Sequence, residues 1–173
     1  SGPGTTNLLT GIGNSFLDAT PVVALGGSSP LTQNSRGAFQ EMDQVSIFKP
    51  VTKWAERVTD TRRIPELVSK AIRMATQGQQ GPVYLDLPGD ILYTQVELDD
   101  VHFPRNLPKQ PRPSGDSELI EEAVALLKQA KRPLILTGSG ILWSDASAAL
   151  QTFVDLTGIP FYTTPQARRV IPE

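Results

Sequence analysis

Apolar residues in the first part of this chain occur either in short continuous runs or at helical spacing. Residues 21–25 contain a continuous apolar run, which is typical of a strand covered on both faces. In 53–58 the side chains alternate, which predicts a strand nearer a sheet edge, and 83–87 predict a further strand. The apolar residues of 7–17 and 64–75 recur on one helical face. This pattern predicts an α/β fold with buried, parallel strands.

The last third of the chain repeats the alternation of helix and strand. We predict helices over 117–130 and 144–156 and strands over 133–137 and 160–163. The Gly-Ser-Gly sequence at 138–140 predicts a tight turn after the first of these strands. The order is that of a βαβ unit with a glycine turn at its switch, as in the first half of a doubly wound, Rossmann-like domain.

A segment without apolar periodicity separates the two parts. Residues 98–113 are rich in proline, aspartate and basic side chains, which indicates an interdomain linker between 1–97 and 114–173. The chain has no initiating methionine and ends abruptly after Pro172-Glu173. We therefore expect a fragment of a longer protein.

Composition and charge narrow the classes of partner. A net charge of −2 with mixed signs gives no general attraction to phosphate backbones, so nucleic acid is not expected as a partner. No apolar run approaches the roughly 20 residues that span a bilayer, so no membrane partner is expected. The chain has no cysteine, which excludes disulfides, thiolate zinc sites and cysteine nucleophiles. The cytoplasm is the default location, although a missing N-terminus would hide a targeting signal.

Polar side chains gather in the loop at 36–45, between two predicted strands. Loops at strand ends frequently carry functional sites. Gln40 in this loop has an amide that can donate and accept, which suits orienting a substrate oxygen, but stabilising the loop is the more frequent role of such a residue. The turn at 138–140 could cradle a phosphate on backbone N–H groups, and a plain tight turn explains it at least as well.

The other polar candidates favour structural roles. His102, the only histidine, lies in the linker, where a solvated surface position is expected. Asp86 and Asp90 could meet at a strand end, but carboxylates on either side of Pro88 more often fix a turn than bind a metal. No cluster of histidine, cysteine or carboxylate residues has the spacing of metal ligands, so no metal site is predicted in this chain.

A series of short motifs extends over nearly the whole chain. They are Ser1-Gly2-Pro3-Gly4-Thr5-Thr6-Asn7-Leu8, Asp18-Ala19-Thr20-Pro21-Val22-Val23, Ala38-Phe39-Gln40-Glu41, Lys53-Trp54 and Gly81-Pro82-Val83-Tyr84-Leu85-Asp86-Leu87-Pro88-Gly89-Asp90. In this order they resemble the thiamine diphosphate-dependent enzymes of the acetolactate synthase group. Within that group, residues 43–45, 50–55 and 64–65 are most similar to benzaldehyde lyase and the 2-hydroxyacyl-CoA lyases. Residues 131–140 resemble the opening of the central domain in the same enzymes, oxalyl-CoA decarboxylase included.

The resemblance implies a domain assignment. Residues 1–97 would be the C-terminal part of a pyrimidine-binding domain, 98–113 a linker, and 114–173 the N-terminal part of a central, nucleotide-binding-like domain. In this family the catalytic glutamate lies upstream of the Ser-Gly-Pro-Gly motif, and the ligands of Mg²⁺ and of the diphosphate belong to a third domain. Thiamine diphosphate and Mg²⁺ are thus implied as cofactors, and the chain alone is expected to be inactive. Because sites in this family lie between subunits, a homo-dimer or homo-tetramer is implied for the intact protein.

The resemblance also implies roles for residues of the first domain. Pro3 and Asn7 would line the pyrimidine side of the cofactor. Gln40 matches the catalytic glutamine that faces the thiazolium and hydrogen-bonds the bound substrate, with Phe39 packing beside it. Gly89 stands where relatives can carry a bulkier side chain, so its small size would leave room for substrate.

In the central domain the resemblance implies a nucleotide site. The residues that would contact FAD, or CoA or ADP, are Gly138, Ser139, Gly140 and Ile141. Near the end of the chain, Arg169 replaces a glycine that is usual in the relatives, which puts an identical site in doubt, though two arginines could equally meet phosphates.

The function implied for the intact protein is that of a thiamine diphosphate-dependent lyase acting on a small-molecule substrate. It would cleave or form a carbon–carbon bond next to a carbonyl, plausibly in 2-hydroxyacyl-CoA compounds. One alternative is an acetolactate synthase-like carboligase; against it, residues 29–32 lack the Pro-Arg pair that synthases carry ahead of the Phe-Gln motif. Another alternative is a non-catalytic fragment whose central domain binds a nucleotide.

Overall fold

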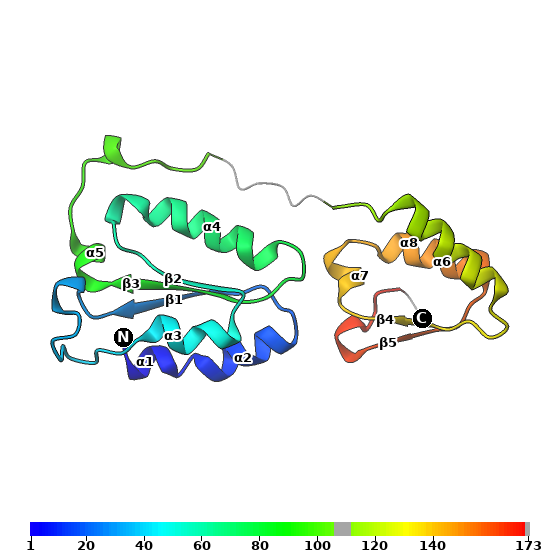
Figure 1. Cartoon of the computed structure of the whole chain (residues 1–173), viewed down its shortest axis with the longest axis horizontal. Helices are drawn as coiled ribbons and strands as arrows, with labels where there is room; N and C mark the ends of the chain where they lie inside the picture. The colour runs from blue at the N-terminus through cyan, green and yellow to red at the C-terminus, as the bar shows by residue number, and fades with distance from the viewer. Residues whose placement is uncertain (106–111, 172–173) are drawn as a thin grey trace. The chain divides into compact units, whose positions relative to one another are not determined.

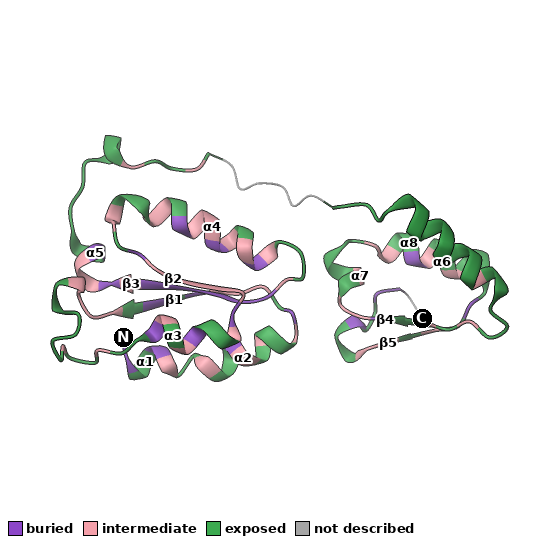
Figure 2. Ribbon diagram, in the orientation of Figure 1, coloured by how far each residue is buried: buried purple, intermediate pink, exposed green. Residues whose placement is uncertain are grey.

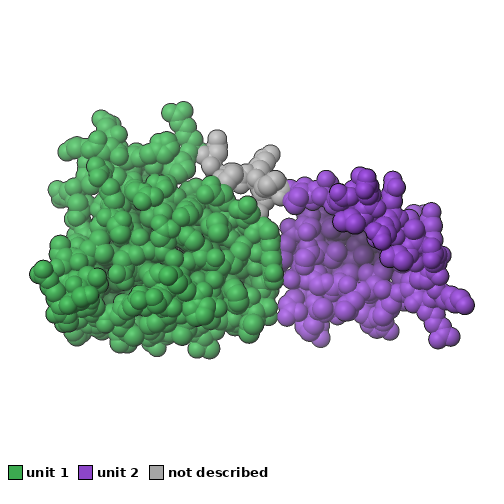
Figure 3. Space-filling model, in the orientation of Figure 1, with its two compact units in different colours: residues 1–110 green, residues 111–173 purple. Residues whose placement is uncertain are grey.

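The computed structural model describes residues 1–105 and 112–171. The chain divides into two compact units, Ser1–Gln110 and Pro111–Glu173, coloured separately in Figure 3. Each unit is built on a parallel sheet, so the predicted α/β class is confirmed. Among the described residues, none of the helices has the length and apolar character needed to cross a membrane.

The sheet of the first unit has the strand order β1-β3-β2. Its strands are β1 (Val23–Ser28), β2 (Trp54–Arg57) and β3 (Val83–Pro88), close to the predicted strand positions. Both neighbours run parallel to β3, and β2 lies at an edge of this sheet, as its alternating pattern predicts. Parallel strands have their carboxyl ends on the same side of the sheet, so the loops that follow β1 and β3 lie close together.

Helices cover both faces of this sheet. Figure 1 shows α4 (Ile64–Thr76) over one face and α1 (Pro3–Thr6), α2 (Leu9–Leu17) and α3 (Gln44–Phe48) over the other. The short α5 (Gly89–Tyr93) follows β3 directly. The helix predicted over 7–17 begins two residues later, because a separate first turn ends at Asn7.

Short 3₁₀ helices complete the connections. They are η1 (Leu31–Gln33), η2 (Lys49–Val51), η3 (Thr61–Arg63), η4 (Leu98–Asp100) and, in the second unit, η5 (Pro165–Ala167). The η4 turn lies in the predicted linker, of which residues 106–111 lie outside the described part. His102 in this segment is exposed, as predicted.

The core of the first unit is centred on β3. Residues 83–86 are all buried, as the colouring of β3 in Figure 2 shows. Tyr84 stacks on Phe48 of α3, with ring centroids 4.2 Å apart and an interplanar angle of 7°. On the opposite face, Leu85 packs with Val58 and Leu67. Burial on both faces explains the continuous apolar pattern of this strand.

The second unit is a small βαβ arrangement. Its strands β4 (Ile135–Thr137) and β5 (Phe161–Thr163) pair in parallel. Its helices are α6 (Ser117–Gln129), α7 (Gly140–Trp143) and α8 (Ser147–Thr157). The single helix predicted over 144–156 therefore has a short additional helix before it. Gly158 ends α8 with a left-handed φ of 64°, a conformation that glycine adopts without steric cost.

Candidate functional site

Two of the sequence motifs meet beside the carboxyl end of β1. Ser1 Oγ donates a hydrogen bond to Gln40 Oε1 at 2.8 Å, across 39 residues of chain. Gly2 has a φ of 51°, and a Cβ built on it would lie 2.7 Å from the carbonyl oxygen of Gln40. A side chain at this position would collide with the Gln40 backbone, so the close approach of the two segments requires glycine. The structure thus brings the Ser-Gly-Pro-Gly turn against the loop that carries Gln40.

The side chains of Phe39 and Gln40 are presented to solvent. Phe39 is 87% exposed, and Gln40 is exposed with a left-handed φ of 59°. A non-glycine residue in this region is uncommon and persists where its surroundings hold it. Of the residues that the structure describes, none accepts a hydrogen bond from the Gln40 amide nitrogen, so this donor is available to a ligand.

The Glu41 carboxylate organises the loop around Gln40. It accepts hydrogen bonds from the backbone N–H groups of Ser35 and, at 3.0 Å, of Ala38. These bonds stabilise the ionised form and lower the pKa of Glu41 below its ordinary value. The Glu41 side chain therefore fixes the backbone of this loop, and the amide nitrogen of Gln40 does not take part in these bonds.

Pro3 and Asn7 lie in the turn that faces this loop. Pro3 occupies the first position of α1, where its missing N–H costs nothing. Asn7 ends the same helix, and its backbone N–H donates to Pro3 O at 3.1 Å. Both residues are exposed, whereas Thr5 between them is buried against β1. The two residues assigned to the pyrimidine side of the cofactor thus share one helical turn.

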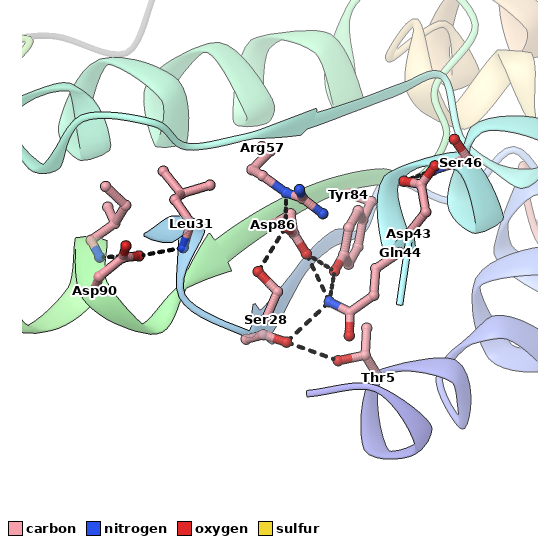
Figure 4. Close-up of polar contacts among 12 residues, drawn as sticks. Thr5, Ser28, Leu31, Asp43, Gln44, Ser46, Arg57, Tyr84, Asp86 and Asp90 are labelled. Carbon is pink, nitrogen blue, oxygen red and sulfur yellow. Dashed lines mark hydrogen bonds and ion pairs between the residues drawn. The ribbon is translucent and has the colours of Figure 1, made fainter. Parts of the chain in front are cut away.

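A buried polar network lies beneath the turn and the loop (Figure 4). Gln44, in the first turn of α3, is fully buried and its Oε1 accepts from Gly2 N. Its Nε2 lies within hydrogen-bond distance of three acceptors: Asp86 Oδ1 at 2.7 Å, Tyr84 Oη at 2.9 Å and Gly27 O at 3.0 Å. Tyr84 in turn donates to Asp86 Oδ1 at 2.7 Å. This side chain links the Ser-Gly-Pro-Gly turn to β1 and β3.

Asp86 is the centre of this network. Its side chain is fully buried and accepts from Arg57 Nε at 2.6 Å and from Ser28 Oγ at 2.8 Å. Burial, with the hydrogen bond to the Asp86 carboxylate, raises the pKa of Tyr84, so the phenol stays protonated as a donor. No buried side-chain nitrogen or oxygen lacks a partner in the described part of the chain. The network is complete without a bound ion.

Asp90 is occupied with a different task. Its carboxylate accepts from the backbone N–H groups of Leu31 at 3.0 Å and Thr32 at 3.3 Å, at the start of η1. Asp86 and Asp90 thus have separate partners, and Asp90 fixes a turn, the more frequent role considered for these carboxylates. Within residues 1–105 and 112–171, no group of three or more histidine, cysteine or carboxylate residues could hold a metal ion.

Gly89 lies at the start of α5 with space around it. A Cβ at this position would lie 3.8 Å from Ser28 O and 3.9 Å from Pro30 Cγ, which are ordinary van der Waals contacts. Its backbone therefore does not require glycine, and a larger side chain would extend from the carboxyl edge of the sheet.

The central-domain candidates lie together in the second unit. Gly138 and Ser139 follow β4, and Gly140 and Ile141 begin α7. All but Ser139 line a shallow, mainly apolar groove of about 480 Å³, whose lining also includes Phe153. A Cβ on Gly140 would meet nothing within 4 Å. The structure brings these residues to one surface of the second unit.

Sequence reasoning did not assign a role to Gln44, Tyr84 or Arg57. The available signal was a glutamine followed by Val45, Ile47 and Phe48 in a short helix capped by Asp43. A polar residue in an apolar helix is buried only when its hydrogen bonds are satisfied, which would have indicated a buried partner.

Comparisons with known proteins agree with this organisation. The family description "Thiamine pyrophosphate enzyme, N-terminal TPP binding domain" matches residues 1–47, and "Thiamine pyrophosphate enzyme, central domain" matches residues 120–173. The chain is 36% identical to a 2-hydroxyacyl-CoA lyase of Arabidopsis thaliana, 37% to a probable acetolactate synthase large subunit of Methanococcus aeolicus and 34% to a glyoxylate carboligase of Escherichia coli O157:H7. Each similarity covers 100% of this chain but only 29–31% of the relative. The chain therefore belongs to the thiamine pyrophosphate enzymes and carries parts of their N-terminal TPP binding domain and their central domain.

Proposed function

We propose that the protein carrying this chain is a thiamine diphosphate-dependent lyase that cleaves or forms a carbon–carbon bond next to a carbonyl. Its proposed substrates are 2-hydroxyacyl-CoA compounds. The observation that carries the proposal is the contact between Gly2 and Gln40, which joins the turn assigned to the pyrimidine to the loop assigned to the reacting carbon. The similarity over the whole chain to a 2-hydroxyacyl-CoA lyase supports this substrate class.

The groups around this contact fit an aminopyrimidine and a polar substrate. Pro3 offers an apolar surface, Asn7 an exposed amide, and Gln40 an unused amide donor beside the exposed ring of Phe39. Thiamine diphosphate supplies an electron sink for the carbanion that forms when the bond beside a carbonyl breaks. In our proposal Gln40 donates a hydrogen bond to the substrate oxygen, and the Phe39 ring excludes water from it. We propose that the Mg²⁺ and diphosphate ligands lie outside this chain.

The second unit has a proposed nucleotide role. We propose that Gly138, Ser139, Gly140 and Ile141 contact CoA or ADP, or FAD, and the open groove beside them supports this.

The proposed domain boundaries are 1–97 for the pyrimidine-binding part, 98–113 for the linker and 114–173 for the central part. We further propose a cytoplasmic homo-dimer or homo-tetramer.

A second candidate function is an acetolactate synthase-like carboligase. The observation that favours it is the 37% identity to an acetolactate synthase large subunit, equal in extent to the similarity with the lyase. Both reactions use the same cofactor chemistry. They differ in the electrophile and in whether the carbon–carbon bond is cleaved or formed. Substrate choice therefore decides between them.

The proposal is tested on the purified protein that carries this chain. Calorimetric titration with thiamine diphosphate in the presence of Mg²⁺ is expected to show saturable binding. Incubation with a 2-hydroxyacyl-CoA is expected to release formyl-CoA and an aldehyde one carbon shorter than the acyl group. The carboligase candidate instead predicts acetolactate and CO2 from two molecules of pyruvate. Absence of cofactor binding would overturn the proposal, and carboligation of pyruvate without lyase activity would replace it with the second candidate.

The space around Gly89 provides a test of substrate size. Because a tryptophan ring there would extend from the carboxyl edge of the sheet, Gly89→Trp is expected to lower kcat/KM for long-chain substrates more than for short-chain ones. Gly89→Ala, whose Cβ meets only ordinary contacts, is the matched control. An unchanged preference between small and large substrates in the tryptophan variant would remove Gly89 from the proposed substrate pocket.

A further inference from the structure

We infer that Gln44 is a positioning residue, whose buried amide holds the Gly2 turn and, through it, Gln40 in the place that cofactor and substrate require. This inference rests on the proposed function, because it gives the Gly2 turn and Gln40 their roles. Gln44 itself is fully buried and does not touch solvent. It acts through the residues it bonds.

The orientation of the Gln44 amide follows from its surroundings. Its nitrogen is a donor and lies 2.7 Å from Asp86 Oδ1, which also accepts from Tyr84. A backbone N–H only donates, so the amide oxygen is turned toward Gly2 N and the amide nitrogen faces Asp86. The Gly2 N–H and the Asp86 carboxylate thus together determine which way the amide points, and the amide places an acceptor for the Gly2 N–H.

The Asp86 end of this chain of bonds is rigid. Arg57 from β2, Ser28 from β1 and Tyr84 from β3 all donate to the same carboxylate, which ties it to every strand of the sheet. Buried hydrogen bonds in such a network polarise one another and restrict the geometry of each member. The sheet therefore provides a fixed reference for the Gln44 amide.

The Gly2 end of the chain of bonds reaches the proposed site. Gly2 lies so close to the Gln40 backbone that any Cβ would collide with it, and the neighbouring Ser1 Oγ donates to Gln40 Oε1. If the Gly2 turn is displaced, it therefore either clashes with Gln40 or loses its contact with the loop that carries Gln40. Pro3 follows Gly2 directly, so the hydrogen bond from Gly2 N to Gln44 affects both sides of the proposed cofactor site.

Two variants separate positioning from packing. Gln44→Met keeps the length of the side chain and removes both hydrogen-bonding groups, so Gly2 loses its acceptor. The double variant Gln44→Glu with Asp86→Asn exchanges the two functional groups. The carboxylate introduced on α3 accepts from Gly2 and from the amide nitrogen introduced on β3, whereas Gly27 O, which accepts from Gln44 in the unaltered protein, loses this donor. Gln79→Glu, at an exposed glutamine beyond α4, is the control for the added carboxylate.

The experiment uses the protein that carries this chain and measures three quantities for each variant. They are the dissociation constant for thiamine diphosphate with Mg²⁺, the thermal midpoint, and hydrogen exchange of the peptides covering 1–8 and 35–45. Loss of one buried hydrogen bond changes an equilibrium by about tenfold. We expect about tenfold weaker cofactor binding and faster exchange in both peptides for Gln44→Met. In the exchanged pair, which restores the acceptor for Gly2 but not the donor to Gly27 O, we expect partial recovery of both.

The outcomes distinguish this inference from the proposed function. If the unaltered protein does not bind thiamine diphosphate, the proposed function fails, while faster exchange of 1–8 and 35–45 in Gln44→Met still supports positioning of the turn. If the unaltered protein binds the cofactor and Gln44→Met binds it equally well, the inference fails and the function stands. A lower thermal midpoint with unchanged cofactor affinity and unchanged local exchange would show a purely structural role and overturn the inference.

Discussion

The two units cover a parallel sheet to very different degrees. In the first unit, residues 83–86 of β3 are all buried and helices lie on both faces. In the second, α6 has no buried residue, and it is coloured as exposed in Figure 2. Leu136 in β4 is 72% exposed. Hydrogen bonds restrict geometry most where water is excluded, and the buried β3 of the first unit provides such an environment for the network of Asp86. The candidate site at Gln40 is consequently preorganised by a buried network. The candidate site at 138–141 instead lies on a sheet that is partly exposed to solvent.

The largest expected effect comes from removing the centre of the buried network. Asp86→Ala leaves the Arg57 guanidinium, the Tyr84 hydroxyl and the Gln44 amide without their shared acceptor, and we expect a loss of about 3–5 kcal/mol in the unfolding free energy of the first unit. The chain has two tryptophans, Trp54 in the first unit and Trp143 in the second.

Single-tryptophan backgrounds therefore allow urea unfolding of each unit to be followed by fluorescence. In the Trp143→Phe background, Asp86→Ala is expected to move the unfolding transition of the first unit to a lower urea concentration. In the Trp54→Phe background, the same substitution is expected to leave the transition of the second unit unchanged. A shift of less than about 1 kcal/mol in the first unit would show that the network adds little to its stability.

The next effect compares two leucines of the second unit. Leu150, only 8% exposed, packs in the core with Ala167 and Val170, and Leu150→Ala is expected to cost about 2–3 kcal/mol because it leaves a cavity. Leu126 of α6 is 64% exposed, so Leu126→Ala is expected to cost less than about 0.5 kcal/mol. Urea unfolding followed through Trp143 measures both. Equal costs would mean that α6 is covered in solution and that the contrast between the units is smaller than described.

Two neighbouring glycines of β1 provide a smaller and more local test. A Cβ on Gly26 would lie 2.3 Å from Tyr84 Oη and 2.8 Å from Thr5 Cγ2, so Gly26→Ala is expected to cost about 1–3 kcal/mol through overpacking. A Cβ on Gly27 would meet nothing within 4 Å, so Gly27→Ala is expected to be neutral within about 0.5 kcal/mol. The midpoint of unfolding of the first unit distinguishes the two. Similar midpoints would contradict the tight packing of α1 on β1.

The sequence predicted the fold more completely than it predicted the site. Strand and helix positions follow from apolar periodicity, and α4 was placed within a residue because its pattern is long and regular. The short helix α7, which precedes the helix predicted over 144–156, was missed because four residues are too few to show a period. The motifs around Gln40 were visible only through resemblance, and their assigned roles stay predictions.

The network of Gln44, Tyr84 and Asp86 could not be read from the sequence because Gln44 lies in α3, whereas Tyr84 and Asp86 lie in β3. Gln44 lies 42 residues from Asp86 along the chain, and the two meet because α3 packs against β3. Side chains that meet through long-range pairing leave no periodic trace in the sequence. The same holds for the contact of Gly2 with Gln40, which depends on the path of the loop.

The smallest expected effect is the response of the Gln40 loop to acid. The pKa of Glu41 is lowered in the folded protein by hydrogen bonds from the Ser35 and Ala38 backbone, so its ionised form is the one that folding stabilises. This contribution is fully present above the ordinary pKa of 4.5 and is lost as the pH falls through the lowered folded value. Between neutral pH and about pH 3, residues 35–41 are expected to exchange amide hydrogens progressively faster, beyond the intrinsic pH dependence of exchange, while α4 does not.

Glu41→Gln removes this titration and provides the control. Because the amide keeps one acceptor oxygen and loses the charge, its loop is expected to show faster exchange at neutral pH and no further change from that group on acidification. An unaltered protein whose loop is equally protected at both pH values would show that Glu41 does not hold the backbone of Gln40. The left-handed conformation of Gln40 would then depend on its contacts with Ser1 and Gly2, which would strengthen the dependence of the proposed site on Gln44.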